Sequence, residues 1–367
     1  YVPAQITLGF EVDGIIATGA ELKNTFCLGK QNKAIMSQHI GDLKNHETLE
    51  FYSESLERFK RLFRCEPKTI VSDLHPDYLS TQFAQKSGLH HIQVQHHHAH
   101  IASVMAEHGI NEKVIGVAMD GVGLGTDGNI WGGEILVCDY QSFESVGHFD
   151  YVPMPGGDKA SKEPWRMGVA YLYKYYGRDF LDLNIPFVKN LDLIKTELLL
   201  LGIDTGINSP LTSSCGRLFD AVAAIMGICE HQVYEAQAAM KLEAMTAENE
   251  TKIFYPIDVN SDGEIDFGVA IKAIVEEIGA GVTSEMISQK FHNTIATAIF
   301  SVVLEIRKKQ KINTVVLSGG CFQNHYLLEQ TAHMLILDLF KVLVHEKVPA
   351  NDGGISLGQL AIAAHQK

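Results

Sequence analysis

The chain has 367 residues, 20% of them charged, and its formal net charge is −14 at pH 7. This length suffices for a large core and for more than one lobe. Phosphate binding needs clustered cations, and the sequence has no Lys/Arg block, so we expect no general nucleic-acid surface. No apolar run reaches membrane-spanning length and no signal peptide opens the chain, so we expect a cytoplasmic protein that does not enter a membrane.

The predicted elements of the first third alternate in a regular order. The strands are expected at 15–18, 25–28, 34–37, 69–72 and 92–95. The helices are expected at 47–63, from Pro76 to Gly88, and from the histidines near 96 to about Gly109. Apolar residues at helical spacing and short continuous apolar runs support these assignments. The resulting order is βββαβαβα.

The rest of the chain repeats this order around a long, mostly helical stretch at about 161–308. The strands are expected at 114–119, 130–138, 143–152, 314–317 and 341–345, and the helices at 322–335 and 354–365. A duplicated βββαβαβα order is typical of the actin, sugar-kinase and Hsp70 superfamily. We therefore predict an α/β fold of two actin-like lobes, 1–112 and 113–367, around a nucleotide cleft. The last helix is a candidate to pack on the first lobe.

Glycine-rich turns fall at matching points of the two predicted lobes. They occupy 19–25, 120–128 and 317–324. Glycine permits positive φ and brings backbone N–H groups close to phosphates, and a helix start favours an anion. Each turn alone is more often a plain tight turn, but together they favour a nucleotide site that includes Asp120, Gly121 and Gly123. A Walker motif is absent, so a P-loop NTPase is disfavoured.

Four histidines lie within the five residues 96–100, after a predicted strand and at the start of a predicted helix. Residues four apart share one helix face, so His96 and His100 can bind one ion together. The alternative is a run of surface histidines. Asp120 ends a predicted strand near the expected cleft, although it is also explained as a turn residue. Asp352 begins the last predicted helix, although it is also explained as a helix N-cap. This mixed ligand set favours Fe(II), Zn(II) or Mn(II).

Several segments, in order over nearly the whole chain, resemble the C-terminal region of the HypF family, the carbamoyltransferases of [NiFe]-hydrogenase maturation. They are 19–28, 37–42, 96–100, 120–133, 155–158, 164–166, 213–220, 234–239, 318–320 and 352–358. The opening Tyr1-Val-Pro resembles the point where the family's YrdC-like domain ends. By this resemblance we expect the acylphosphatase, zinc-finger and YrdC-like parts to lie outside this chain.

The resemblance implies a cofactor, a reaction and a partner. Upstream YrdC-like domains make carbamoyl-adenylate from ATP, and this region passes the carbamoyl group to the C-terminal cysteine thiol of HypE, for the cyanide ligands of the hydrogenase iron. One divalent ion, Fe or Zn, maps onto His96, His100, Asp120 and Asp352. The implied nucleotide contacts are Gly216, Asp220, Gly319, Gly320 and Asn324.

Two cations are candidates to offset charge on the adenylate during transfer. Lys23 lies in the first glycine turn, and Arg166 follows Pro164-Trp165. In a cleft that excludes water, a cation placed near the charge that develops during transfer stabilises that charge strongly. A plain surface or structural cation is the equally weighted alternative for both residues. Asp220 likewise either takes ribose hydroxyls or is simply a paired helix residue.

Three other functions remain open at this point. The related tRNA threonylcarbamoyl-transfer family shares the lobes and the two histidines, but the acidic balance and Pro155-Gly-Gly-Asp158 argue against it. A small-molecule O-carbamoyltransferase resembles HypF closely over this region. The third alternative is an actin-like scaffold that binds nucleotide and metal but transfers nothing.

Overall fold

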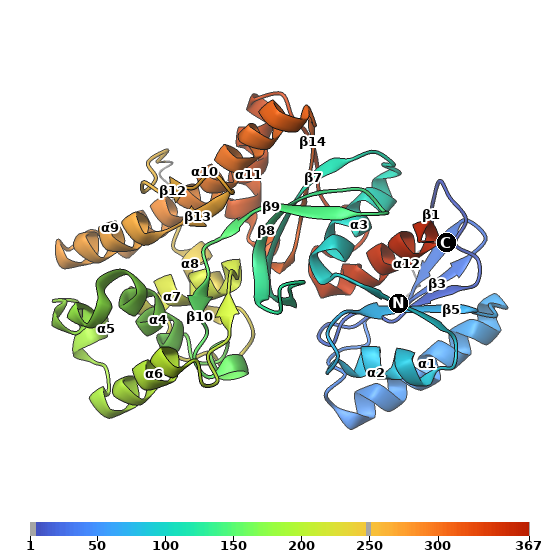
Figure 1. The fold of residues 1–367 in the computed structure, drawn as a ribbon, viewed down its shortest axis with the longest axis horizontal. Coiled ribbons are helices and arrows are strands. Elements are labelled where there is room, and N and C mark those ends of the chain that lie inside the picture. Colours follow the sequence, from blue (N-terminus) through green and yellow to red (C-terminus); the bar gives the residue numbers. More distant parts are fainter. Residues whose placement is uncertain (1–4, 247–250, 367) are drawn as a thin grey trace.

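The computed structural model describes residues 5–246 and 251–366, so the Tyr1-Val-Pro opening lies outside the described residues. Two mixed β-sheets dominate the structure, with two helices between them and a group of helices beyond the second sheet (Figure 1).

No helix among the described residues combines the length and the apolar character needed to cross a membrane. All six cysteines are free thiols, and Cys321 alone among them is partly exposed.

The first lobe follows the predicted order closely. Its elements are β1 (Gln5–Thr7), β2 (Ile15–Ala17), β3 (Cys27–Lys30), β4 (Lys33–Met36), α1 (His46–Phe63), β5 (Thr69–Asp73), α2 (Leu79–Lys86), β6 (His90–Val94) and α3 (His96–His108). The sheet order is β1-β4-β3-β2-β5-β6. Strand β1, which pairs with β4 at the edge of the sheet, is not among the predicted strands.

The second lobe repeats this topology. Its central elements are β7 (Val114–Leu124), β8 (Ile130–Cys138), β9 (Phe143–Phe149), α10 (Ser284–Gln310), β14 (Thr314–Ser318), α11 (His325–Leu337), β15 (Lys341–Leu343) and α12 (Ile355–His365). The order β9-β8-β7-β14-β15 matches β4-β3-β2-β5-β6, and both central pairs, β2–β5 and β7–β14, are parallel. The predicted duplicated actin-like fold is confirmed.

The predicted helical stretch contains the expected helices and three short strands. Its elements before α10 are α4 (Trp165–Tyr176), α5 (Pro186–Lys189), α6 (Leu193–Thr205), β11 (Leu211–Thr212), α7 (Cys215–Ile225), α8 (Gln237–Ala244), β12 (Asp258–Val259), β13 (Glu264–Asp266) and α9 (Gly268–Gly279). Helix α10 directly precedes β14 as α1 directly precedes β5, and these two strands occupy the same position in their sheets. It therefore belongs to the repeat, and the inserted elements precede it.

Helices α3 and α12 lie between the two sheets and belong to a core that both lobes share (Figure 1). On the first sheet, Ala17 and Val71 face this core, whereas the neighbouring Ile16 and Ile70 face α1 and α2. This alternation is the period of two that places successive strand residues on opposite faces. Helix α3 contacts β7 and β14 of the second sheet, while α12 contacts β2 of the first. Each terminal helix of a lobe thus covers the sheet of the other lobe.

A glycine allows these two helices to approach closely. A Cβ on Gly358 of α12 would lie 1.8 Å from the carbonyl oxygen of Ala99 on α3, so only glycine fits there. Near the start of α12, the hydroxyl of Ser103 donates to the carbonyl oxygen of Gly354 at 2.8 Å. The tight crossing brings the N-terminal ends of α3 and α12 together, and three of the four candidate metal ligands, His96, His100 and Asp352, lie at those ends.

Candidate functional site

The histidine run begins helix α3. The Gln95 side chain caps the helix by accepting a hydrogen bond from the His98 backbone N–H at 2.8 Å. All four histidines are buried, and the first and the last of them point to the same place because they are four residues apart. His98 points elsewhere, with its Nε2 2.6 Å from the Asp139 carbonyl oxygen. The sequence-predicted pair, His96 and His100, is therefore the pair that converges.

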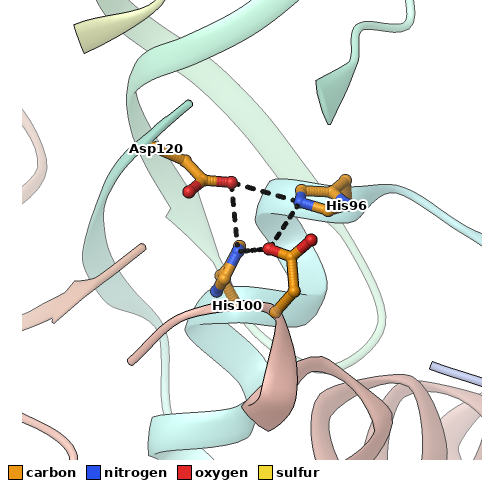
Figure 2. Close-up of side chains that lie close together, drawn as sticks. His96, His100 and Asp120 are labelled. Atoms are coloured by element: carbon orange, nitrogen blue, oxygen red, sulfur yellow. Dashed lines mark hydrogen bonds and ion pairs between the residues drawn. The ribbon is translucent and has the colours of Figure 1, made fainter. Parts of the chain in front are cut away.

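Two carboxylates, carried by different elements, complete the group (Figure 2). Asp120 lies in β7, where the pairing with β8 is interrupted between Met119 and Gly123. Asp352 lies in a short 3-10 helix, Asp352–Gly354, directly before α12. Asp120 Oδ2 is 3.3 Å from His96 Nε2 and 3.4 Å from His100 Nε2. The corresponding distances from Asp352 Oδ1 are 3.7 and 3.6 Å.

The extent of β7 differs from the prediction. The sequence pattern ends the strand at 119 and places a glycine-rich turn at 120–128, whereas β7 continues to Leu124 through a bulge. A bulge bends a strand and re-aims a side chain. Glycine is needed after it, because a Cβ on Gly123 would lie 2.5 Å from His97 Cε1 and 2.8 Å from His96 Cδ2.

The donor atoms fit a divalent cation. His96 Nδ1 lies 2.7 Å from Asp73 Oδ2, a carboxylate oxygen that can only accept, so Nδ1 carries the proton and a lone pair remains on Nε2. His100 Nε2 is buried without a hydrogen-bond partner. The two imidazole nitrogens and the two carboxylate oxygens lie within 4.8 Å of one another. Two imidazoles with two carboxylates are a ligand set that suits Zn(II) or Fe(II).

The electrostatics of the group agree with a bound cation. Burial alone would lower the pKa of His96, but Asp73, Asp120 and Asp352 outweigh it and hold this pKa well above its usual value. Burial likewise opposes charge on Asp120, yet its close contacts with His100 and His96 hold its pKa well below the usual range. The four groups therefore require about two positive charges among them, which two protons or one divalent ion can supply.

Two residues that sequence reasoning missed hold the histidines from behind. Asp73 ends β5 and contacts His96, and Ser318 ends β14 with its Oγ 3.3 Å from His100 Nδ1. Metal-bound histidines commonly give their second N–H to such a partner. Their position in the sequence could have indicated them, because each is the last residue of a buried parallel strand, at the sheet edge where the nucleotide cleft was expected.

Predicted nucleotide residues surround Asp120. The Gly320 N–H donates to Asp120 Oδ1 at 3.0 Å, which leaves Oδ2 facing the histidines. Gly319 has φ 105°, and a Cβ there would lie 2.2 Å from the Met119 carbonyl oxygen. A Cβ on Gly216 would lie 3.0 Å from Gly121 Cα. Backbone from residue 216 and from residues 319–320 thus packs closely around residues 119–121.

Two further predicted nucleotide residues already have partners within the protein. Asp220 Oδ2 lies 2.7 Å from Arg217 Nε, and its Oδ1 accepts from Gln232 at 3.0 Å. Burial raises the pKa of Asp220 to about 6, against the opposing charge of Arg217. Asn324 caps α11 by accepting from the Leu327 N–H, and its amide nitrogen lies 2.9 Å from His292 Nε2. Their nucleotide contacts remain predictions.

The two predicted catalytic cations are paired as well. Lys23 Nζ lies 2.6 Å from Glu235 Oε1, an ion pair that joins the first lobe to the segment before α8. Arg166 Nε lies 2.5 Å from Glu163 Oε2, and its guanidinium lies over the Trp165 ring. Their roles in transfer also remain predictions.

A buried carboxyl beside the nucleotide segment gives a pH-dependence prediction. Burial raises the pKa of Glu134 to about 8 from 4.5, although the hydroxyls of Ser213 and Ser145 donate to it. The folded protein thus retains a proton that the unfolded chain loses above pH 4.5, so stability falls as pH rises from 4.5 to about 8.

Replacing Glu134 by Gln should remove this loss of stability. We expect the stability advantage of E134Q over the wild type to grow by about 3 kcal/mol between about pH 5.5 and pH 8. Urea unfolding of both proteins across this range measures the difference. A difference that stays constant with pH would contradict the assignment.

Two family models match most of the chain. The model described as "HypF Kae1-like domain" matches residues 11–107, and the one described as "Carbamoyltransferase, Kae1-like Domain, second subdomain" matches residues 116–359. The chain is 38% identical to carbamoyltransferase HypF of Synechocystis over 98% of its own length and 48% of that protein. A HypF homolog of Cupriavidus necator is 35% identical, with 96% of this chain and 92% of that protein covered.

Solved structures agree with these relatives. A crystal structure of full-length HypF in the phosphate- and nucleotide-bound form has a TM-score of 0.95 and 45% identity, and it covers 100% of this chain and 57% of that one. The HypF structure from T. kodakarensis has a TM-score of 0.89 and 33% identity, covering 99% and 48%. The chain therefore spans about half the length of these full-length proteins. It belongs to the HypF carbamoyltransferase family.

Proposed function

We propose that this chain transfers a carbamoyl group from carbamoyl-adenylate to a cysteine thiol. The observation that carries the proposal is the buried group of His96, His100, Asp120 and Asp352 beside the glycine segments of the cleft. Membership of the HypF family supports the same reaction. The acceptor is the C-terminal cysteine of HypE, and the thiocarbamate supplies the cyanide ligands of the hydrogenase iron.

The reaction requires one bond to form and one to break. The acceptor sulfur attacks the carbamoyl carbon, the bond from that carbon to the phosphate oxygen breaks, and AMP leaves while the thiol gives up its proton. The four ligand residues would hold one divalent ion, Fe or Zn, which supplies a Lewis acid when bound. The chain's own groups orient the donor and keep water away from it. No cysteine of this chain needs to act as nucleophile.

The positions of the glycines support a binding direction for the adenylate. Gly216 and Gly320 lie close to Gly121 and Asp120, so backbone without side chains borders the ligand group, and we place the phosphate there. We place the adenosine half between residues 213–220 and 318–324, the two segments that border this point from different elements. Lys23 and Arg166 are proposed to offset remaining charge on the adenylate, which requires each to exchange its present carboxylate partner.

Six free thiols fit the reducing conditions of the cytoplasm, where we place the protein.

Carbamoyl transfer to different acceptors tests the proposal. The purified, metal-loaded chain is given preformed carbamoyl-adenylate and either HypE, HypE with its terminal cysteine replaced by alanine, or a small alcohol. Mass spectrometry should detect carbamoylation only on HypE with the cysteine intact. Carbamoylation of the alcohol alone would favour an O-carbamoyltransferase, and binding of the adenylate without any transfer would favour a scaffold.

A further inference from the structure

The duplication places equivalent residues behind the two histidines. Strands β5 and β14 occupy the same position in their sheets, each has five residues, and each begins with threonine. Their last residues are Asp73 and Ser318, so these two positions correspond. Asp73 contacts Nδ1 of His96, and Ser318 contacts Nδ1 of His100. One histidine therefore has a charged partner and the other a neutral one.

Ser318, the neutral partner of His100, is connected through His345 to the buried carboxylate of Glu107. Ser318 Oγ lies 2.8 Å from His345 Nε2, and His345 Nδ1 lies 3.1 Å from Glu107 Oε1. Ser318 and Glu107 are buried, and the side chain of His345 is only 5% exposed. Burial raises the pKa of Glu107, but contacts with His345 and the Lys347 N–H outweigh it, so this pKa lies below its usual value and the group is a carboxylate. A carboxylate can only accept hydrogen bonds.

The donors and acceptors then fit in one direction. The Glu107 carboxylate lies 3.1 Å from His345 Nδ1 and favours the proton on that nitrogen, so that His345 Nε2 can accept from the hydroxyl of Ser318 at 2.8 Å. The Ser318 oxygen is therefore free to accept from the Nδ1–H of His100. This assignment leaves the lone pair of His100 on Nε2, the atom that faces Asp120 and Asp352.

We propose that Ser318, His345 and Glu107 form a positioning relay that fixes the tautomer and the orientation of His100 for the metal ion. The proposal rests on the metal site of the proposed function and adds three residues to it. Metal ligands with such hydrogen-bonded partners typically lose about 10- to 100-fold in metal affinity when the partner is removed. The relay acts on the metal ion only through His100, so its members are positioning residues.

Glu107 also links the relay to the fourth ligand. Its Oε1 and Oε2 accept from the backbone N–H groups of Glu346 and Lys347, at 3.1 and 2.8 Å. These residues belong to the segment between β15 and the 3-10 helix that carries Asp352. One buried carboxylate on α3 thus fixes the histidine relay and the backbone that leads to a metal-ligating aspartate.

Metal affinity measured without substrate tests the relay. Ser318→Ala removes the central hydroxyl, and Ser318→Thr restores it. The control is Ser288→Ala, which removes a buried hydroxyl 3.5 Å from His292 Nδ1, outside the ligand group. Zn²⁺ affinity is measured by competition with a chelator, and Co²⁺ absorption reports the geometry of the ligands. Circular dichroism confirms that each variant is folded.

We expect S318A to bind Zn²⁺ about tenfold more weakly and to shift the Co²⁺ bands, while S318T and S288A stay near the wild type. Wild-type affinity with an unchanged Co²⁺ spectrum in S318A would overturn the relay. A loss of affinity as large in S288A as in S318A would overturn it too. If the wild type bound neither ion, or if H100A bound as tightly as the wild type, the proposed metal site itself would be wrong, whatever S318A did.

Discussion

Replacing His100 by alanine is expected to remove the metal ion and to abolish carbamoyl transfer without unfolding the chain. The imidazole supplies one of four donor atoms that lie within 4.8 Å of one another, and no further His, Cys, Asp or Glu among the described residues belongs to this group. Metal-assisted stabilisation of developing charge is worth several kcal/mol, so the rate should fall on the order of a thousand-fold or more. Metal analysis of the purified variant and its turnover of carbamoyl-adenylate measure the two effects.

His98 offers a matched control on the same helix. It is buried like His100, but its Nε2 contacts the Asp139 carbonyl oxygen and not the ligand group. His98→Ala should therefore lose some stability and keep its metal. If the double variant His96→Ala/His100→Ala retained full metal and full activity, the metal assignment would fail.

Removing Asp220 should destabilise the protein by about 3–5 kcal/mol, because it leaves the Arg217 guanidinium buried without its charge partner. Asp220 is 1% exposed and Arg217 8% exposed, so little solvent screens the lost pair. Urea unfolding of Asp220→Ala measures the loss. Asp204→Ala is a suitable control, since Asp204 is exposed and its carboxylate accepts from the Tyr173 hydroxyl, so its loss should cost less than about 1 kcal/mol.

Replacing both partners separates the structural role of Asp220 from its predicted ribose contact. The double variant Arg217→Met/Asp220→Leu buries no charge, so most of the lost stability should return. If Asp220 also binds ribose hydroxyls, this folded variant should show a raised KM for carbamoyl-adenylate with kcat largely kept, because such a contact acts equally in ground and transition states. An unchanged KM would leave Asp220 a purely structural residue.

The repeat was predictable from the sequence because local patterns encode it. Short apolar runs between turns marked the strands to within a few residues, and the i, i+4 spacing identified His96 and His100. Local polar contacts shifted some helix starts. The helix predicted from Pro76 begins at Leu79, because the Asp73 carboxylate accepts the His75 N–H and holds a turn before it. Asn324 likewise caps α11 later than predicted, after a short 3-10 helix.

The partners of the predicted residues could not be obtained from the sequence. Glu107, Ser318 and His345 come from a helix, a strand end and the segment after another strand, and nothing in their spacing along the chain indicates contact. The same holds for Lys23 and Glu235, which are far apart in sequence and 2.6 Å apart in space. Hydrophobic periodicity specifies which face of an element is buried, but polar contacts across elements depend on how those faces meet.

The exchange of α3 and α12 between the sheets also constrains the order of events during synthesis. The first sheet is complete once β6 has been made, but the face that carries Ala17 and Val71 is covered by α12. That helix emerges from the ribosome only after the entire second sheet and the inserted helices. Until then a nascent chain exposes an apolar sheet face, and this stage is where aggregation or chaperone binding would act.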